Sequence, residues 1–182
     1  MKIILETERL ILRQLVPSDD IGMFELDSNP EVHKYLGNKP VTNIEECRSI
    51  IESVQKQYLE NGIGRWAMIE KSSGNFTGWT GLKFIKDKIN NHVDFYEVGY
   101  RIIQEYWGKG YATESTKASL KYAFENLSAK EVFGITNVEN LKSRKVLEKC
   151  GLKFIETFIW HEWHEVNCNW LKITKEEWER QT

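Results

Sequence analysis

The sequence is poor in cysteine and has no cysteine pair at a metal-binding or redox spacing. Its three cysteines, Cys47, Cys150 and Cys168, are odd in number and widely separated, so neither a disulfide framework nor a zinc site fits them. The histidines of His161-Glu162-Trp163-His164 lack the spacing of the helical zinc motif and stand in a strand-like segment. We therefore expect three plain thiols and no metal.

Long apolar runs and an excess of basic charge are also missing. Only Ile3-Ile4-Leu5 precedes Glu6, and no apolar run reaches membrane-spanning length, which predicts a cytoplasmic protein with no membrane partner. The formal net charge of −2 supplies no basic field for nucleic acid. With no Pro-rich or Ser-rich stretch, no internal repeat and 41% hydrophobic residues, the sequence predicts a single domain over residues 1–182.

The most informative segment that is present is Gly108-Lys109-Gly110-Tyr111-Ala112. It falls between a strand-like run, Val98 to Ile103, and a helix-like run, Thr113 to Phe124. Glycines allow close approach to the backbone, and the first amides of a helix have no intrahelical acceptor, so this corner is suited to hold a phosphate. The alternative is a tight turn without a ligand. The segment matches neither the Walker loop nor the dinucleotide fingerprint, because Thr113 stands where the latter needs a third glycine.

The same corner resembles the pyrophosphate loop of the GNAT superfamily of acyl-CoA-dependent N-acetyltransferases, Gln/Arg-x-x-Gly-x-Gly/Ala. Trp107 departs from the first position, but Trp107 to Glu114 is similar to the branch that includes ribosomal-protein and spermidine N-acetyltransferases. Asn140 to Leu152 resembles the family's Asn-x-x-Ser-x-x-x-x-x-Lys-x-Gly-Phe segment, with Leu152 in place of Phe. Thr7 to Arg13 resembles the first strand of this branch, so the three matches extend over nearly the whole chain.

Hydrophobic spacing and turn residues predict a mixed α/β (α+β) domain, in which a mostly antiparallel sheet of six to seven strands is flanked by helices. The resemblance implies the GNAT fold, with the sheet splayed between its fourth and fifth strands and the pantetheine arm lying between them. Helices are expected from Asp20 to Leu26, from a Thr42/Glu45 capping box to Asn61, from Thr113 to Phe124, and after Asn140. Strands are expected at Leu5–Leu15, Arg65–Glu70, Phe76–Lys86, Val93–Ile103, Glu131–Thr136, Lys153–Glu162 and Asn169–Ile173.

The resemblance also implies which residues bind acetyl-CoA as the acyl donor. The amide near Ile102 is expected to polarise the thioester carbonyl. Asn140 is expected to hold the pantetheine or a phosphate, with Ser143 one helical turn along, although Asn140 is equally suited to cap its helix. The expected cofactor-binding set is Ile102, Ile103, Trp107, Gly108, Lys109, Gly110, Tyr111, Ala112, Thr113, Asn140 and Ser143.

Glu97 is the candidate general base for removing a proton from the attacking amine. It precedes Gly99, which we expect to form a β-bulge, and a Glu-x-Gly-Tyr setting is common in the branch. The alternatives are an exposed carboxylate, a salt-bridge partner, or a base that acts through water. The tyrosine that many family members use to protonate the sulfur is replaced by Leu147; the substitutes are Tyr35, Tyr96 and Tyr100, or the thiolate leaves without a dedicated acid.

The predicted function is an N-acetyltransferase that moves an acetyl group from acetyl-CoA to a primary amine, either a protein N-terminus or a small amine such as a polyamine, by direct attack in a ternary complex. A monomer or homodimer is expected. The alternatives are a non-catalytic acyl-CoA-binding module and a nucleotide-binding protein. The expected acceptor-lining residues are Glu25, Asp27, Tyr35, Trp79, Trp160 and Trp163.

Overall fold

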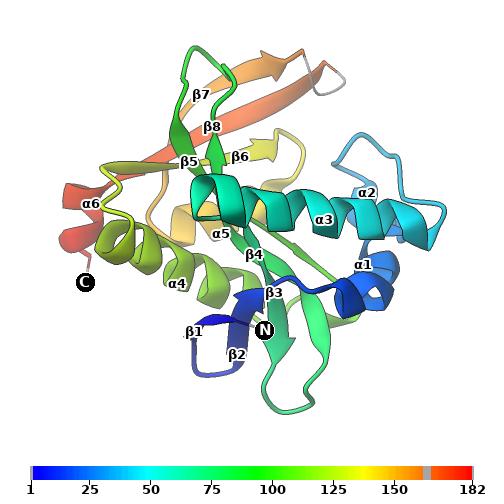
Figure 1. The fold of residues 1–182 in the computed structure, drawn as a ribbon. Coiled ribbons are helices and arrows are strands. Elements are labelled where there is room, and N and C mark those ends of the chain that lie inside the picture. Colours follow the sequence, from blue (N-terminus) through cyan, green and yellow to red (C-terminus); the bar gives the residue numbers. More distant parts are fainter. Residues whose placement is uncertain (1, 162–164, 182) are drawn as a thin grey trace.

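A computed structural model describes residues 2–161 and 165–181 (Figure 1). The described residues form one eight-stranded sheet in the order β1-β2-β3-β4-β5-β6-β8-β7. Every neighbouring pair is antiparallel except β5 and β6, which run parallel. The strands are β1 Ile3–Glu6, β2 Leu10–Gln14, β3 Arg65–Glu70, β4 Phe76–Ile85, β5 Phe95–Ile102, β6 Glu131–Asn137, β7 Lys153–Trp160 and β8 Val166–Thr174.

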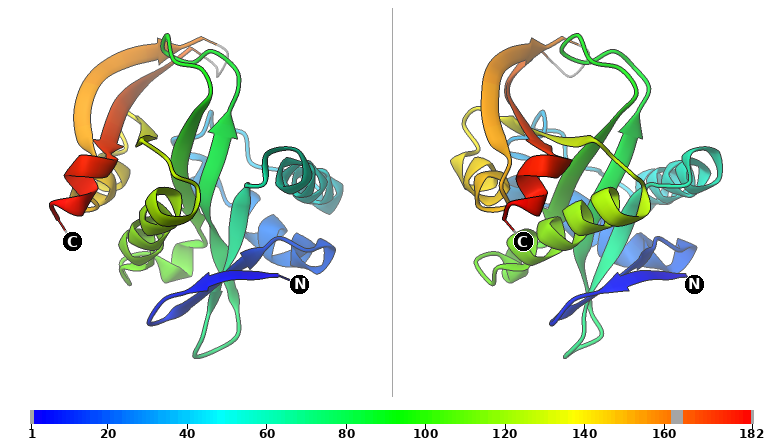
Figure 2. Two further views of the ribbon diagram at one scale, coloured as in Figure 1. Left: turned by 60° about the vertical axis from the view of Figure 1, so that its left-hand side comes forward. Right: turned by 90° about the vertical axis from the view of Figure 1, so that its left-hand side faces the viewer.

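Helices cover both faces of the sheet, with α1 and α3 on one face and α4 on the other (Figure 2). The main core lies between these layers and includes the fully buried Trp66, Leu82 and Phe124. No helix in the described part of the chain is both long and apolar enough to cross a membrane. The helices are α1 Asp20–Asp27, α2 Pro30–His33, α3 Ile44–Asn61, α4 Tyr111–Asn126, α5 Leu141–Lys149 and α6 Lys175–Glu179.

The expected mixed, mostly antiparallel sheet is confirmed, but the strand count of six to seven is wrong. The run expected as one strand is a hairpin of β1 and β2, closed where the Thr7 amide donates to the Leu10 carbonyl over 2.9 Å. The Thr7 hydroxyl accepts from the Leu10 amide, so a side chain stabilises a turn that hydropathy does not reveal. The capping box of α3 is Asn43 with Glu46, one residue beyond the expected pair.

The splay lies where it was expected. Parallel pairing joins β5 to β6 only at Tyr96 with Val132 and at Glu97 with Phe133. Beyond these pairs β5 continues to Ile102 and β6 continues to Asn137, while the two ribbons diverge (Figure 2). The strands β5 and β6 are the fourth and fifth of the strands expected from the sequence, because the first expected strand is the hairpin of β1 and β2. One edge of β5 is therefore left open beside the loop that leads into α4.

The expected bulge at Gly99 is wrong. The register of β4 with β5 is unbroken from Phe95 to Ile102, and Gly99 stands directly opposite Gly81. A Cβ at Gly99 would lie 2.9 Å from an Arg65 guanidinium nitrogen and 3.1 Å from a Glu97 carboxylate oxygen. Glycine is needed here because an ion pair approaches the strand, not because the strand bends.

Candidate active site

The loop before α4 presents a series of free amides to one place. Gly108 and Gly110 adopt φ of 76° and 85°, in the left-handed region where glycine carries no steric penalty. The Glu114 amide makes the first helical bond, to the Gly110 carbonyl over 3.1 Å. Among the residues that the structure describes, the backbone amides of residues 108–113 donate to no acceptor. Consecutive free amides at the positive end of a helix dipole favour an anion.

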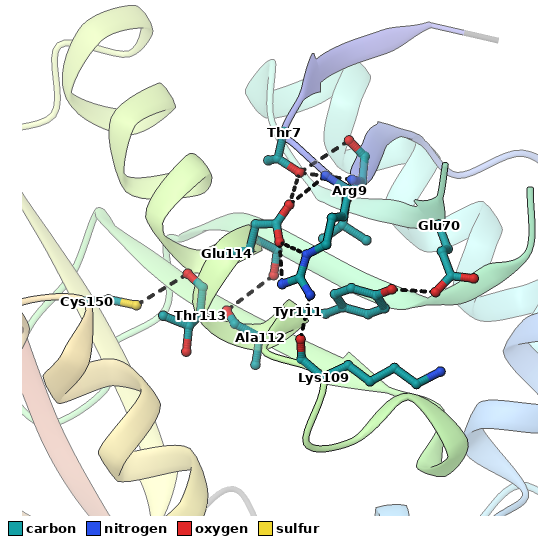
Figure 3. Close-up of polar contacts among 11 residues, drawn as sticks. Thr7, Arg9, Glu70, Lys109, Tyr111, Ala112, Thr113, Glu114 and Cys150 are labelled. Carbon is teal, nitrogen blue, oxygen red and sulfur yellow. Dashed lines mark hydrogen bonds and ion pairs between the residues drawn. The ribbon is translucent and has the colours of Figure 1, made fainter. Parts of the chain in front are cut away.

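Arg9, on the turn between β1 and β2, braces this loop (Figure 3). Its guanidinium donates to the Lys109 carbonyl over 2.8 Å and to the Glu114 carboxylate over 2.7 Å. Thr7 donates to the same carboxylate over 2.6 Å. Burial raises the pKa of Glu114, but the hydrogen bonds from Thr7 and Arg9 outweigh burial and hold that pKa below its ordinary value.

Other side chains fix the start of α4 to the sheet and to α5. The Tyr111 hydroxyl donates to the Glu70 carboxylate of β3, and the ring of Tyr111 lies 4.7 Å from the Arg9 guanidinium. On the opposite side the Cys150 thiol contacts the Thr113 carbonyl at 3.6 Å (Figure 3). Burial raises the pKa of Cys150 to about 11, so it remains a thiol. The first turn of α4 is therefore held from both sides.

The end of β5 presents its backbone to the opening beside β6. The Ile103 amide donates to the carbonyl of Thr77 on β4 over 3.0 Å, so it points toward β4. Because N–H groups alternate sides along a strand, the Ile102 amide faces away from β4, toward the opening. The Trp107 indole donates to the Ile102 carbonyl over 2.7 Å and links the strand end to the loop. This orientation suits the expected contact of the Ile102 amide with a thioester carbonyl.

Asn140 and Ser143 lie across the opening, at the start of α5. The Asn140 carboxamide accepts from the Ser143 amide over 3.1 Å, so Asn140 caps its helix, as one of its two expected roles required. Tyr100 of β5 donates to the Ser143 hydroxyl over 3.1 Å. Leu147 is 2% exposed, and Gly134 of β6 has no room for a Cβ because the Leu147 side chain would lie 2.8 Å away. Leu147 is thus a core residue.

Glu97 forms an ion pair with Arg65 of β3, on the face of the sheet that α1 and α3 cover. Its side chain is 13% exposed, and Arg65 also donates to the Glu97 backbone carbonyl over 3.0 Å. The salt-bridge alternative therefore describes the position of this carboxylate. A general-base role for Glu97 stays a prediction.

The expected acceptor-lining residues fall into separate groups. Asp27 is 1% exposed, its carboxylate accepts from Arg101 over 2.5 Å, and the His33 ring nitrogen Nε2 lies 3.4 Å away. Trp79 lies between two cations, with its ring 5.3 Å from the Arg65 guanidinium and 5.1 Å from that of Arg101. We call Asp27, His33, Arg65, Trp79 and Arg101 the charged floor. It is built from α1, α2 and strands β3 to β5.

The remaining expected residues lie elsewhere. Glu25 lines an open pocket of about 350 Å³ at the end of β5. Tyr35 packs under the Lys34 ammonium, 5.5 Å from its ring centre. Trp160 lines a different pocket, between the β4–β5 hairpin and β7, and Trp163 lies outside the described residues. Glu25 shares its pocket with Asn29, Ile103, Gln104 and Glu105.

Sequence reasoning missed the residues that support the site from a distance. Arg9 belongs to a segment matched as a strand, and nothing local indicates that it contacts Lys109. Arg65 and Arg101 each pair with a carboxylate from another element. No local signal places them on the same face, because Arg65 lies on β3 and Arg101 lies on β5. In the described part of the chain no group of three or more His, Cys, Asp or Glu residues is arranged to hold a metal.

A sheet opened beside a helix that begins with free amides suits an extended ligand with an anionic group, and comparisons with known proteins identify the family. The family model described as acetyltransferase (GNAT) domain matches residues 9–153. The chain is 31% identical over 150 residues to the uncharacterized N-acetyltransferase YoaA of Bacillus subtilis, covering 82% of each chain. It is 34% identical over 158 residues to FsC-acetyl coenzyme A-N(2)-transacetylase of Aspergillus fumigatus, covering 85% of this chain and 66% of that one.

Solved structures agree in fold. A GNAT-family acetyltransferase from Bacillus anthracis superposes with a TM-score of 0.79 at 24% identity, covering 97% and 99% of the two chains. A spermidine N-acetyltransferase from Vibrio cholerae, solved with CoA and spermine, has a TM-score of 0.74 at 21% identity, covering 95% and 99%. The chain belongs to the GNAT family of N-acetyltransferases and is an acyltransferase, which confirms the resemblance that the glycine loop indicated.

Proposed function

We propose that this chain transfers an acetyl group from acetyl-CoA to a primary amine by direct attack in a ternary complex. The observation that supports acetyl-CoA as the acyl donor is the row of free amides at residues 108–113, beside the open edge of β5. A diphosphate satisfies such amides, and a pantetheine arm is long and polar enough to pair with a strand edge. One extended ligand with both parts is a coenzyme A thioester.

The donor-binding roles follow from where each residue lies. The loop amides bind the diphosphate, and the Ile102 amide donates to the thioester carbonyl, where negative charge develops during attack. The carboxamide of Asn140 and the hydroxyl of Ser143 serve the pantetheine from the other side of the opening. Of the expected set, Lys109 contributes mainly its backbone, because its ammonium lies 4.5 Å from the centre of the Tyr106 ring.

The acceptor enters from the face that α1 and α3 cover. Glu97 and the charged floor lie on this face, and Glu97 receives the proton that the amine loses, directly or through a water. Glu25 and Glu105 give the neighbouring pocket an acidic rim, which favours a cationic acceptor. A small amine such as a polyamine, or a protein N-terminus, has this chemistry, and the spermine named with the Vibrio cholerae neighbour is one such amine.

The test is release of free CoA from acetyl-CoA over a panel of polyamines, amino acids, aminated small molecules and N-terminal peptides. Time-dependent, amine-dependent release supports the proposal. No release with any amine, together with tight calorimetric binding of acetyl-CoA, would favour a non-catalytic acyl-CoA-binding module. Preference for ATP over acetyl-CoA in the same calorimeter would favour a nucleotide-binding protein.

A further inference from the structure

The hydrogen bond from Tyr100 to Ser143 joins the two halves of the splayed sheet. Tyr100 lies on β5, three residues beyond the last residue that pairs with β6. Ser143 lies on α5, which packs on β6 and β7. The 3.1 Å contact between the two hydroxyl groups therefore spans the opening that the proposed function assigns to the pantetheine arm. A ligand in that opening passes beside this pair.

The chain offers no hydroxyl at the position where many family members have one. Leu147 fills that position and packs against Gly134 and Leu152 in the core. Of the other tyrosines considered, Tyr96 packs on Phe84 with ring centres 5.1 Å apart, and Tyr35 packs under the ammonium of its neighbour Lys34. Tyr100 is the one of these three whose hydroxyl contacts α5 on the far side of the opening.

We propose that Tyr100 is the catalytic acid that protonates the departing thiolate of coenzyme A, and that Ser143 returns the proton to it. This inference rests on the proposed function. The Tyr100 hydroxyl exchanges its acceptor, from the Ser143 oxygen in the free protein to the sulfur in the donor complex.

The atoms and electrons of the step balance. The amine nitrogen attacks the thioester carbon, the C–N bond forms and the C–S bond breaks with its electron pair on sulfur. The sulfur takes the hydroxyl proton of Tyr100, the phenolate takes the hydroxyl proton of Ser143, and solvent replaces that proton. The proton lost from nitrogen passes to Glu97 or water, so the products are a neutral amide and a thiol.

The environment of Tyr100 keeps its hydroxyl protonated before the thiolate departs. Burial raises the pKa of Tyr100 to about 12, against the opposing effect of its hydrogen bond to Ser143. The hydroxyl is therefore a donor throughout the pH range of ordinary assays. A thiolate forming within hydrogen-bond reach in a dry site is a far stronger acceptor than a neutral hydroxyl.

The first experiment compares Tyr100→Phe with wild type and with Tyr122→Phe, a tyrosine of α4 that packs edge-on against Trp66. We expect Tyr100→Phe to lower kcat at least about tenfold, in the range seen for general acids. The calorimetric dissociation constant for acetyl-CoA should change less than about twofold, and Tyr122→Phe should match wild type. Unchanged kcat in a folded, CoA-binding Tyr100→Phe protein would overturn the inference while leaving the proposed function intact.

A second measurement keeps the fold and the hydroxyl. Replacing the seven tyrosines with 3-fluorotyrosine lowers the pKa of the phenol with little change in shape. If Tyr100 is the acid, the more acidic fluorinated phenol gives up its proton more readily, and kcat near neutral pH should rise about twofold or more. The same labelling of Tyr100→Phe should leave its kcat unchanged. A kcat that changes equally in both proteins, or in neither, contradicts the assignment, whereas a wild type that releases no CoA rejects the proposed function itself.

Discussion

Arg9 donates a hydrogen bond to the backbone carbonyl of Lys109 over 2.8 Å, joining residues one hundred positions apart (Figure 3). In a trans peptide the carbonyl and the following amide point in opposite directions. Holding the Lys109 carbonyl toward Arg9 therefore turns the Gly110 amide the other way, toward the anion site. The first hairpin of the chain thus sets the orientation of the loop before α4.

Arg9→Met should weaken acetyl-CoA binding because the peptide between Lys109 and Gly110 becomes free to rotate. We expect the calorimetric dissociation constant to rise about tenfold, equivalent to about 1.4 kcal/mol. Arg48→Met is the control. Arg48 lies on α3, has a similarly exposed side chain and also pairs with carboxylates. Equal affinities of the two variants would show that the brace does not orient the loop.

Gly110→Val tests the loop itself. A side chain at this position is opposed both by the φ of 85° and by the Arg9 guanidinium, which would lie 3.3 Å from the added Cβ. We expect acetyl-CoA to bind at least about tenfold more weakly, a loss of about 1.4 kcal/mol. Gly74→Val is matched for backbone strain, since Gly74 has φ of 74° with open space around it in the β3–β4 turn. Both variants should melt at lower temperature, but only Gly110→Val should lose affinity.

The sequence predicted the elements that local patterns determine. The 18-residue helix α3 ends at Asn61 before Gly62, as its apolar spacing and the following glycine indicated. The glycine loop and the strand before it were placed correctly, because glycine and β-branched residues act locally. The capping box was misplaced by one residue, because Thr42 and Asn43 are both acceptable caps and only packing decides between them.

Contacts between distant segments were beyond prediction. Glu97 was identified from its strand and its neighbours, but its partner Arg65 is 32 positions away and shares its face only through the register of β3, β4 and β5. The same holds for Tyr100 and Ser143, 43 positions apart. Alternation along one strand gives the face of a residue, but the residue opposite it depends on pairing that a single sequence does not specify.

Glu97→Gln separates a catalytic carboxylate from a structural one. The amide of glutamine still accepts from Arg65 but no longer takes a proton, so kcat should fall at least about tenfold near neutral pH. Affinity for acetyl-CoA should not change. Glu131→Gln is the control, because Glu131 is a β6 carboxylate that also pairs with a cation, Lys172, at 3.2 Å. If both variants lose stability equally and keep full kcat, Glu97 is only an ion-pair partner.

His33 should make stability fall as the pH falls. Burial and then the charge of Arg101 lower the pKa of His33 from its ordinary 6.5, and together they outweigh the attraction of Asp27. Below pH 6.5 the unfolded chain takes up a proton that the folded chain resists, so this contribution to stability is complete above 6.5 and declines as pH falls toward the folded pKa.

Urea unfolding at a series of pH values checks this dependence on His33. Between neutral pH and the onset of carboxylate titration, the free energy of unfolding should fall more steeply in wild type than in His33→Gln, which has no imidazole to protonate. His92→Gln is the control, because His92 stacks on the ring of Trp170, with ring centres 5.1 Å apart, and is not one of the charged-floor residues. Equal slopes in wild type and His33→Gln would mean that the Asp27 carboxylate stabilises the protonated ring as strongly as burial disfavours it.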